Sequence, residues 1–306
     1  MCQKRQHRPL RLGEAGLAGD SNADADSRGS YMLLFVYGTF CRGLSRNTVL
    51  KDSVYLGIAS CKGKLIDIGF YPALIQGDGK VIGEIYQIDP EVLLTKLDEI
   101  EGYSKNSEAG SLYIRGKTLA TLFSTGDNVD VSLYYFNKAP KKYPPISCGD
   151  YRRYLLDQNT TPVYYLAYGS NLSTSRLKGR IGSWGKTIKG SIPDYRLVYN
   201  KDDGTGHAYA NITVRTVDKR CPAVAYEVSR ESILFLDGCE GVHNNHYIRT
   251  VLPFKSDSGE EIMGYVYIAT PEKLVWGKKP TEKYRMHLLE GYMEHNLGKL
   301  ELYESY

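Results

Sequence analysis

The sequence lacks the long apolar runs of membrane proteins: no stretch approaches the roughly 18 apolar residues that a transmembrane helix needs. We also expect no secretory signal, because no apolar segment follows the basic residues near the N-terminus. Residues 1–30 are polar and contain few aliphatic side chains, so we expect a disordered leader outside the fold. A chain of 306 residues, of which 42% are hydrophobic, is long and apolar enough for two soluble domains.

The chain also has little excess of positive over negative charge. The formal net charge is +4, and no segment concentrates Lys and Arg as a nucleic-acid-binding stripe would. Neither nucleic acid nor a membrane is therefore an expected partner, and the sequence does not indicate an oligomeric state. A small molecule remains the expected partner class.

Metal-binding patterns are missing as well. None of the six cysteines belongs to a Cys-x-x-Cys pair, and their spacing indicates neither a metal site nor a disulfide framework. His243 and His246 lie close together, but no second ligand pair accompanies them. We therefore expect no metal, and free thiols in a reducing cytoplasm.

Phenylalanine is rare, whereas tyrosine is abundant: the chain has 7 Phe and 26 Tyr. Many of the tyrosines fall in strand-like runs. Tyrosine fits a pleated, half-buried surface and offers a hydroxyl group to polar ligands. This composition suits a pocket lined from strands.

A repeat runs through the chain. The segment 34–40, Leu-Phe-Val-Tyr-Gly-Thr-Phe, resembles 165–172, Tyr-Leu-Ala-Tyr-Gly-Ser-Asn-Leu. The segment 97–102, Leu-Asp-Glu-Ile-Glu-Gly, resembles 236–241, Leu-Asp-Gly-Cys-Glu-Gly. Five matches in the same order at nearly constant spacing indicate duplication. The other three pair 113–115 with 247–249, 133–136 with 265–268, and 151–156 with 284–289.

The two predicted domains, 31–160 and 161–306, share one layout. An apolar strand enters a Tyr-Gly loop; further strands, a helix, two more strands and a closing helix follow. Because strands dominate, we predict an α+β protein of two tandem mixed β-barrel-like domains with few helices. The expected strands are 33–37, 73–75, 81–88, 113–115 and 134–136, then 163–168, 207–214, 223–228, 247–251 and 263–268.

Each copy contains the signals of a helix that ends in Glu-Gly. In the first copy Asp89-Pro90 opens the helix and Gly102 ends it. In the second copy Ser229 is the expected N-cap and Gly241 the end. The closing helices are expected near 149–157 and 281–296. The side chains expected to face the core are Leu93, Leu94, Leu97 and Ile100, and Ile233, Leu234, Phe235 and Leu236.

The glutamates before these glycines, Glu101 and Glu240, are candidate catalytic residues. A carboxylate at a helix C-terminus faces the negative end of the helix dipole, where Lys or Arg would be favoured. An acid held in such a place and partly buried tends to have a raised pKa, which suits general acid–base chemistry. The alternative is a surface glutamate tolerated at a frayed helix end. Recurrence in both copies weakens that alternative without removing it.

The Tyr-Gly loops are candidate binding elements. A glycine at the end of a strand lets the backbone turn sharply and lets a ligand approach closely. The amides that follow can point together and hold a carboxylate or carbonyl oxygen. A simple tight turn is the alternative interpretation. The loop residues are Tyr37, Gly38, Thr39 and Phe40 in the first copy, and Tyr168, Gly169, Ser170 and Asn171 in the second.

These motifs resemble a known family. Val36-Tyr37-Gly38-Thr39 together with Leu97-Asp98-x-x-Glu101-Gly102 is similar to the γ-glutamylamine cyclotransferase branch of the γ-glutamyl cyclotransferase-like superfamily. Phe-Tyr-Pro-Ala at 70–73 and Gly-Glu-Ile-Tyr at 83–86 strengthen that match. In the second copy, 167–172 resembles the γ-glutamyl cyclotransferase branch proper. The two copies cover nearly all of 31–300, an arrangement similar to a bacterial two-domain subgroup.

The resemblance implies an intramolecular reaction. The α-amine of a γ-L-glutamyl amide attacks its own γ-carbonyl, which releases 5-oxo-L-proline and a free amine. By resemblance, Glu101 or Glu240 carries the proton, the Tyr-Gly loop holds the glutamyl head, and Tyr135 and Tyr267 contribute to the pocket. No metal or organic cofactor is implied, and this agrees with a cyclisation that needs mainly orientation and one proton shuttle.

The resemblance leaves the substrate open. Free γ-glutamyl amino acids, γ-glutamyl-lysine-type amines, glutathione and the γ-glutamyl cap of a butirosin-type aminoglycoside share one head group. It also leaves open whether both copies act, since Gly238-Cys239 could loosen Glu240. Two alternatives to a cyclotransferase remain. One is a ligand-binding protein without turnover, and the other is a thiol enzyme that uses Cys239, which has no counterpart at Ile100.

Overall fold

The computed structural model describes residues 31–139, 143–158, 162–215 and 220–300. The leader expected at 1–30 lies outside the described residues. None of the helices in the described part of the chain has the length and apolar character needed to cross a bilayer. The five cysteines in the described residues carry free thiols.

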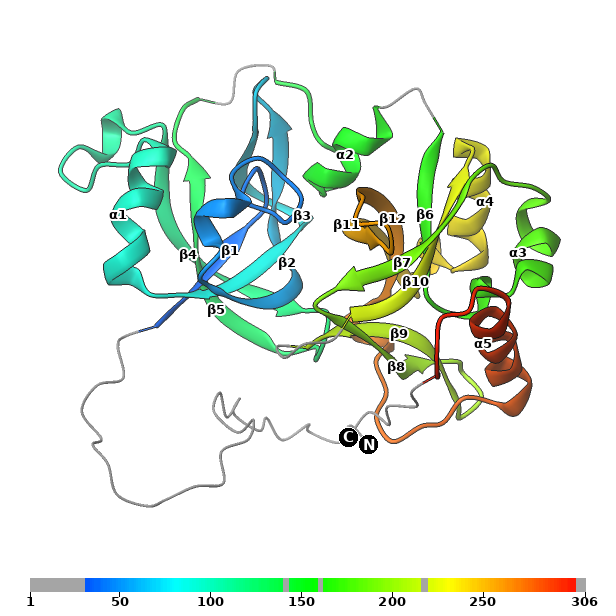
Figure 1. The fold of residues 1–306 in the computed structure, drawn as a ribbon. Helices are drawn as coiled ribbons and strands as arrows, with labels where there is room; N and C mark the ends of the chain where they lie inside the picture. The colour runs from blue at the N-terminus through cyan, green and yellow to red at the C-terminus, as the bar shows by residue number, and fades with distance from the viewer. Residues whose placement is uncertain (1–30, 140–142, 159–161, 216–219, 301–306) are drawn as a thin grey trace. The chain divides into compact units, whose positions relative to one another are not determined.

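The first copy forms a closed barrel (Figure 1). Its strands follow the order β1-β3-β2-β4-β5, and β1 closes the barrel by running parallel to β5 at Leu34 and Ser132. The other neighbouring strands are antiparallel. The strands are β1 Met32–Val36, β2 Val54–Asp67, β3 Pro72–Ile88, β4 Tyr113–Leu122 and β5 Asn128–Phe136.

The second copy forms another closed barrel, in the order β10-β6-β12-β11-β7. It closes as the first does, because β6 runs parallel to β12 at Tyr165 and Tyr265. The prediction of two tandem mixed barrels is confirmed. The strands are β6 Val163–Ala167, β7 Thr187–Pro193, β10 Arg220–Val228, β11 Tyr247–Ser256 and β12 Glu261–Ala269, with β8 Tyr195–Asp202 and β9 Ala208–Val214 as a separate two-stranded sheet.

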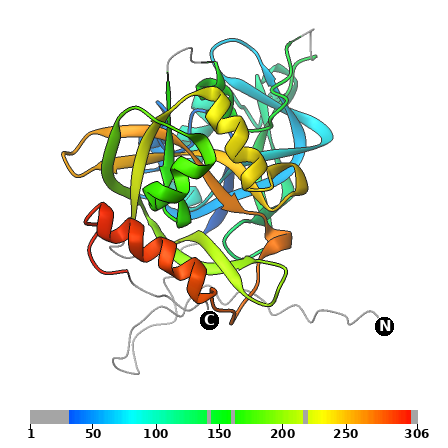
Figure 2. The ribbon, with the colours of Figure 1, turned by 90° about the vertical axis from the view of Figure 1, so that its right-hand side faces the viewer.

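Short helices accompany the barrels, and Figure 2 shows α3, α4 and α5 gathered beside the second one. Each begins at a side chain that accepts a hydrogen bond from a backbone amide of its first turn, as polar N-caps do. Gly102 has φ +61° at the end of α1, a left-handed conformation that favours glycine. The helices are α1 Pro90–Glu101, α2 Tyr151–Asp157, α3 Thr174–Ile181, α4 Arg230–Cys239 and α5 Glu282–Glu294, and their caps are Asp89, Asp150, Ser173, Ser229 and Thr281.

Two expectations about these elements are wrong. The segments 73–75 and 81–88 belong to one strand, β3, which stays paired with β2 across a bulge at Lys62 and Lys64. In α4 the side chains of Leu234 and Phe235 are 64% and 56% exposed. At 3.6 residues per turn, only Ile233 and Leu236 share the buried face, so an unbroken apolar run in a helix cannot be buried throughout.

Candidate active site

The first cavity lies where β1 ends and α1 ends, and it comprises about 500 Å³ of space, part of which is open to solvent. It brings Glu101 together with the four predicted residues of the first Tyr-Gly loop. Its walls are largely apolar and aromatic, and Arg46 and Glu101 are its charged groups. The lining residues are Phe35, Val36, Tyr37, Gly38, Thr39, Phe40, Arg46, Tyr71, Pro72, Ile100, Glu101, Leu112, Tyr113 and Tyr134.

Glu101 is the last residue of α1, and its side chain is largely removed from water. Burial raises the pKa of this carboxyl group to about 7, and the positive charge of Arg46 opposes the shift. Within the described residues, the carboxylate forms no hydrogen bond and no ion pair. Glu101 can therefore both accept and release a proton near neutral pH, as an acid–base catalyst must.

The Tyr-Gly loop presents free backbone donors to the same cavity. Its turn is held by hydrogen bonds from the Cys41 amide to the Gly38 carbonyl (2.9 Å) and from the Arg46 amide to the Thr39 carbonyl (3.0 Å). In the described part of the chain, the amides of Thr39 and Phe40 donate to no protein acceptor. These two N–H groups are available to a carbonyl or carboxylate oxygen of a ligand.

A chain of polar contacts fixes the base of the first cavity. The Tyr37 hydroxyl donates to the Tyr134 carbonyl (2.6 Å), and the Tyr134 hydroxyl donates to Oδ1 of Asp98 (2.6 Å). Arg115 Nε lies 3.2 Å from the same carboxylate oxygen. The conformation of the Tyr-Gly loop is thereby coupled to the helix that carries Glu101.

The second copy contains the same series of polar contacts. The Tyr168 hydroxyl donates to the Tyr267 carbonyl (2.5 Å), and the Tyr267 hydroxyl donates to Oδ1 of Asp237 (2.9 Å). Arg249 pairs with Oδ2 of the same carboxylate at 3.3 Å. The Asp of each Leu-Asp-x-x-Glu motif and the Arg of each Tyr-Ile-Arg motif are therefore structural partners. Sequence reasoning found both motifs but assigned a role only to the glutamates.

The structure corrects the alignment of Tyr135 with Tyr267. Tyr134 lines the first cavity as Tyr267 lines the second, whereas Tyr135 points to the opposite face of β5 and packs against the apolar side chains there. Successive side chains of a strand alternate between its two faces, so an alignment shifted by one residue selects the wrong face. The shared hydroxyl contact to Asp98 or Asp237 identifies the true pair.

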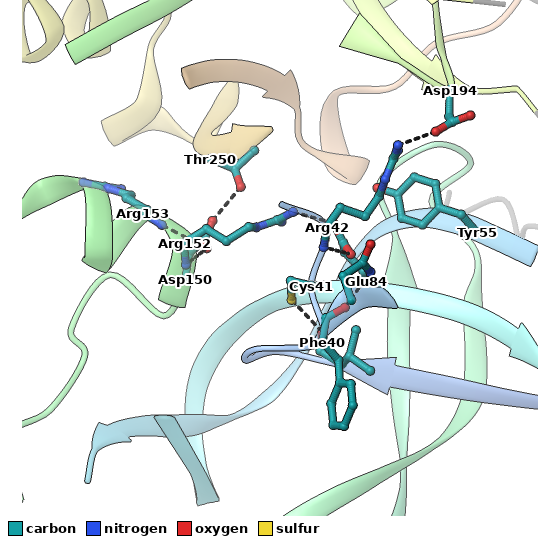
Figure 3. Close-up of polar contacts among 12 residues, drawn as sticks. Phe40, Cys41, Arg42, Tyr55, Glu84, Asp150, Arg152, Arg153, Asp194 and Thr250 are labelled. Carbon is teal, nitrogen blue, oxygen red and sulfur yellow. Dashed lines mark hydrogen bonds and ion pairs between the residues drawn. The ribbon is translucent and has the colours of Figure 1, made fainter. Parts of the chain in front are cut away.

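The buried carboxylate of Glu84, to which the sequence analysis assigned no role, binds the segment that follows the first Tyr-Gly loop (Figure 3). Glu84 is fully buried on β3 and forms an ion pair with Arg152 of α2. It also accepts hydrogen bonds from the Arg42 amide (2.9 Å) and the Tyr86 hydroxyl (3.1 Å). The available signal was a lone charged residue in the apolar run 81–86. Glu84 thus anchors the segment that follows the Tyr-Gly loop.

The same segment reaches residues of the second copy. The Arg42 guanidinium pairs with Asp194, at the end of β7, and lies 4.7 Å from the ring centre of Tyr55 (Figure 3). The hydroxyls of Tyr55 and Tyr195 are 2.7 Å apart. These contacts link the first loop to β7 and β8, so the second copy supports the first site whatever else it does.

The second cavity holds its glutamate differently. Glu240 pairs with Arg180 of α3 at 2.6 Å, and Asn171 Nδ2 donates to the same Oε1 atom at 3.1 Å. One oxygen of the Glu240 carboxylate is thus occupied by Arg180 and Asn171, whereas the Glu101 carboxylate has no such contact among the described residues. About 300 Å³ of space adjoins it. The lining contains all the predicted residues of this copy: Tyr168, Gly169, Ser170, Asn171, Glu240 and Tyr267.

Two family models match the chain. The model described as "Gamma-glutamyl cyclotransferase, AIG2-like" matches residues 34–153, and the model described as "AIG2-like family" matches residues 222–300. The first match contains the whole of the first cavity's loop and Glu101.

Curated relatives agree with these models. A Vibrio cholerae protein, provisionally named a gamma-glutamylcyclotransferase, is 33% identical over 121 residues, which are 39% of this chain and 94% of that protein. YkqA of Bacillus subtilis, which bears the same provisional name, is 29% identical over 154 residues, which are 48% of this chain but only half of the relative.

A solved structure resembles both copies together. The crystal structure of YkqA matches with a TM-score of 0.63 and covers 87% of this chain and 93% of its own. The aligned residues are 19% identical, so this likeness shows the shared fold alone.

Proposed function

This chain belongs to the AIG2-like γ-glutamyl cyclotransferase family, and from that premise we propose that it cleaves γ-L-glutamyl amides in its first cavity. The products are 5-oxo-L-proline and a free amine. The observation that carries the proposal is the buried, unpaired Glu101 carboxyl beside the free amides of the Tyr-Gly loop. Its direct test is the release of 5-oxoproline from a panel of γ-glutamyl compounds by the full chain. A folded protein that releases none contradicts it.

The proposed reaction needs one proton carrier. The substrate's α-nitrogen forms a bond to its own γ-carbonyl carbon, and Glu101 takes a proton from that nitrogen. The carbonyl oxygen gains negative charge and is held by the amides of Thr39 and Phe40. The amide carbon–nitrogen bond then breaks, and Glu101 returns the proton to the leaving amine. Because both reacting groups belong to one molecule, the cavity contributes mainly orientation.

The pH dependence should report Glu101. The base form is required, so we expect kcat/KM, corrected for ionisation of the substrate amine, to fall about tenfold per pH unit below about 7. A rate profile between pH 5 and 9 measures this, and a carbon NMR titration that compares the protein with Glu101→Gln assigns the group. A flat profile between pH 6 and 8 would remove Glu101 from the role.

The first cavity favours some amines over others. Phe40, Ile100 and Leu112 provide apolar walls, and Arg46 places a positive charge near Glu101. Both features suit a neutral or apolar leaving amine and disfavour a polycationic aminoglycoside, which would need an acidic rim. We therefore propose small γ-glutamyl amides as substrates ahead of a butirosin-type antibiotic intermediate.

A thiol enzyme that uses Cys239 would be sensitive to alkylation, unlike a cyclotransferase that uses Glu101. Cys239 is exposed and lines a space that adjoins the second cavity beside Glu240, so it is accessible to alkylating reagents. If the first cavity carries the reaction, alkylation of Cys239 leaves 5-oxoproline release unchanged. Complete inactivation by alkylation, prevented by Cys239→Ser, would support the thiol mechanism instead.

A further inference from the structure

The second cavity continues into a neighbouring space, with which it shares Ser170, Glu240 and Tyr247. This part of the second cavity carries an excess of positive charge. It comprises about 720 Å³ of space, part of which is open to solvent, and its charged lining consists of three cationic side chains and one carboxylate: Arg176, Arg180, Lys201 and Glu240. The first cavity is lined by one cation and one carboxylate. Arg180 and Glu240 pair with each other, whereas Arg176 and Lys201 form no ion pair with any of the described residues.

Arg176 presents its charge to this cavity from α3. Its Nε atom donates to the Ser170 hydroxyl at 3.1 Å, and within the described residues its guanidinium forms no ion pair. The contact to a neutral hydroxyl holds the side chain in place without neutralising it. An arginine fixed in this way is a ready donor to a carboxylate or phosphate.

Lys201 is the more unusual of the two cations, because only 3% of its surface is exposed. Its ammonium nitrogen lies 3.0 Å from Nδ1 of His246 and over the rings of Tyr209 (5.1 Å) and Tyr247 (5.6 Å). With Nδ1 accepting from Lys201, His246 keeps its Nε2–H as a further donor. Burial of an ammonium group without a carboxylate partner is unfavourable, and a bound anion would offset that cost.

The carboxylates that act on Lys201 are those of Asp202, Glu240 and Asp203, and none of them forms an ion pair with it among the described residues. Glu240 pairs with Arg180 instead. Oδ1 of Asp202 accepts from the Gly204 amide, and Oδ1 of Asp203 accepts from the amides of Thr205 and His207. Both are committed to the turn between β8 and β9, so they leave the Lys201 ammonium available to the cavity.

We propose that the second cavity binds a small molecule that bears two separate anionic groups, of the dicarboxylate class. One group lies at Arg176 and the Ser170 hydroxyl, and the other at Lys201 and His246. We assign one anionic group to each cation, because Arg176 lies on α3 and Lys201 on β8 and neither has an ion-pair partner among the described residues. This assignment goes beyond the cyclotransferase reaction and does not depend on Glu101.

Calorimetric titration of the full chain with simple probes tests the site. Glutarate carries two carboxylates, glutaramide is its neutral counterpart, and inorganic phosphate places its charge on one centre. We expect glutarate to bind saturably and at least about tenfold more tightly than glutaramide or phosphate. Absence of glutarate binding, or equal affinity for glutaramide, would overturn the proposal. Tighter binding of phosphate would replace the dicarboxylate class with a single phosphate-type group and so would also overturn it.

Matched variants locate the binding. Lys201→Met keeps the apolar stem against Tyr209 and Tyr247, and we expect it to weaken glutarate binding at least about tenfold. Lys273→Met removes an equal charge from a residue that influences Lys201 but does not line the cavity, and should change affinity less than about twofold. Arg176→Gln is the second test if Lys201→Met unfolds. Unchanged affinity in a folded Lys201 or Arg176 variant would place glutarate elsewhere. Release of 5-oxoproline is scored separately in each variant, so loss of binding and loss of turnover remain distinguishable.

Discussion

Replacing Glu101 by Gln is expected to lower kcat/KM for 5-oxoproline release by about 10²- to 10⁴-fold, the usual contribution of a positioned acid–base group. Glutamine preserves the size of the side chain and the packing at the end of α1 but cannot accept the proton of the attacking amine. Steady-state rates on any γ-glutamyl amide that the unmodified protein turns over measure the effect. In the described part of the chain Glu101 forms no ion pair, so the substitution removes none, and urea unfolding of the variant checks that it remains folded.

The matched control is Glu240→Gln. It makes the same chemical change at the corresponding position of the other copy, and its rate should stay within a few-fold if the first cavity carries the reaction. The reverse pattern, with Glu240→Gln inactive and Glu101→Gln active, would move catalysis to the second cavity. Full activity in the double variant would exclude both glutamates as proton carriers.

Glu101→Gln should also stabilise the folded protein at alkaline pH. The pKa of Glu101 is raised by burial to about 7, so the folded state binds this proton more tightly than the unfolded chain does. The cost of the buried charge is therefore absent near pH 4, grows between about 4.5 and 7, and is constant above 7. We expect Glu101→Gln to raise the free energy of unfolding by about 2 kcal/mol at pH 8, with the partial exposure allowed for, and by nothing at pH 4. Urea unfolding at the two pH values measures it.

The sequence predicted the features that rest on local chemistry. Asp89 and Ser229 cap their helices, and Gly102 adopts the left-handed conformation, because capping and turning depend on a few adjacent residues. The end of each helix could thus be predicted from the motif Leu-Asp-x-x-Glu-Gly. Duplication reinforced those predictions, since two diverged copies preserve the same local signals.

Features that depend on partners distant in sequence could not be predicted. Arg180 contacts Glu240 but precedes it by sixty positions in the sequence, so no local pattern at either residue predicts their ion pair. Without that contact the two glutamates looked equivalent. The choice of Tyr135 over Tyr134 failed for a related reason: both fit the strand, and only the closed barrel decides which side chain faces the cavity.

Arg152→Met is expected to destabilise the protein by about 3–5 kcal/mol, because it removes the cation from a fully buried ion pair and leaves the Glu84 carboxylate uncompensated. Methionine retains most of the apolar stem, so the loss measures charge rather than volume. Urea unfolding at pH 7 gives the free energy. A loss below about 1 kcal/mol would mean that Glu84 is protonated or reached by water in the folded state.

A second substitution distinguishes the contribution of the Glu84–Arg152 ion pair from that of the hydrogen bonds that position the Tyr-Gly loop. Glu84→Gln in the Arg152→Met background removes the stranded charge, while its amide oxygen can still accept from the Arg42 amide and the Tyr86 hydroxyl. The double variant should therefore recover most of the lost stability and give a large coupling energy in a double-mutant cycle. Recovery of stability with normal 5-oxoproline release would show that the hydrogen bonds to residue 84 suffice to position the Tyr-Gly loop. Recovery of stability without activity would show that the loop needs the charged pair, because the segment that follows Phe40 is tied to the barrel through that carboxylate.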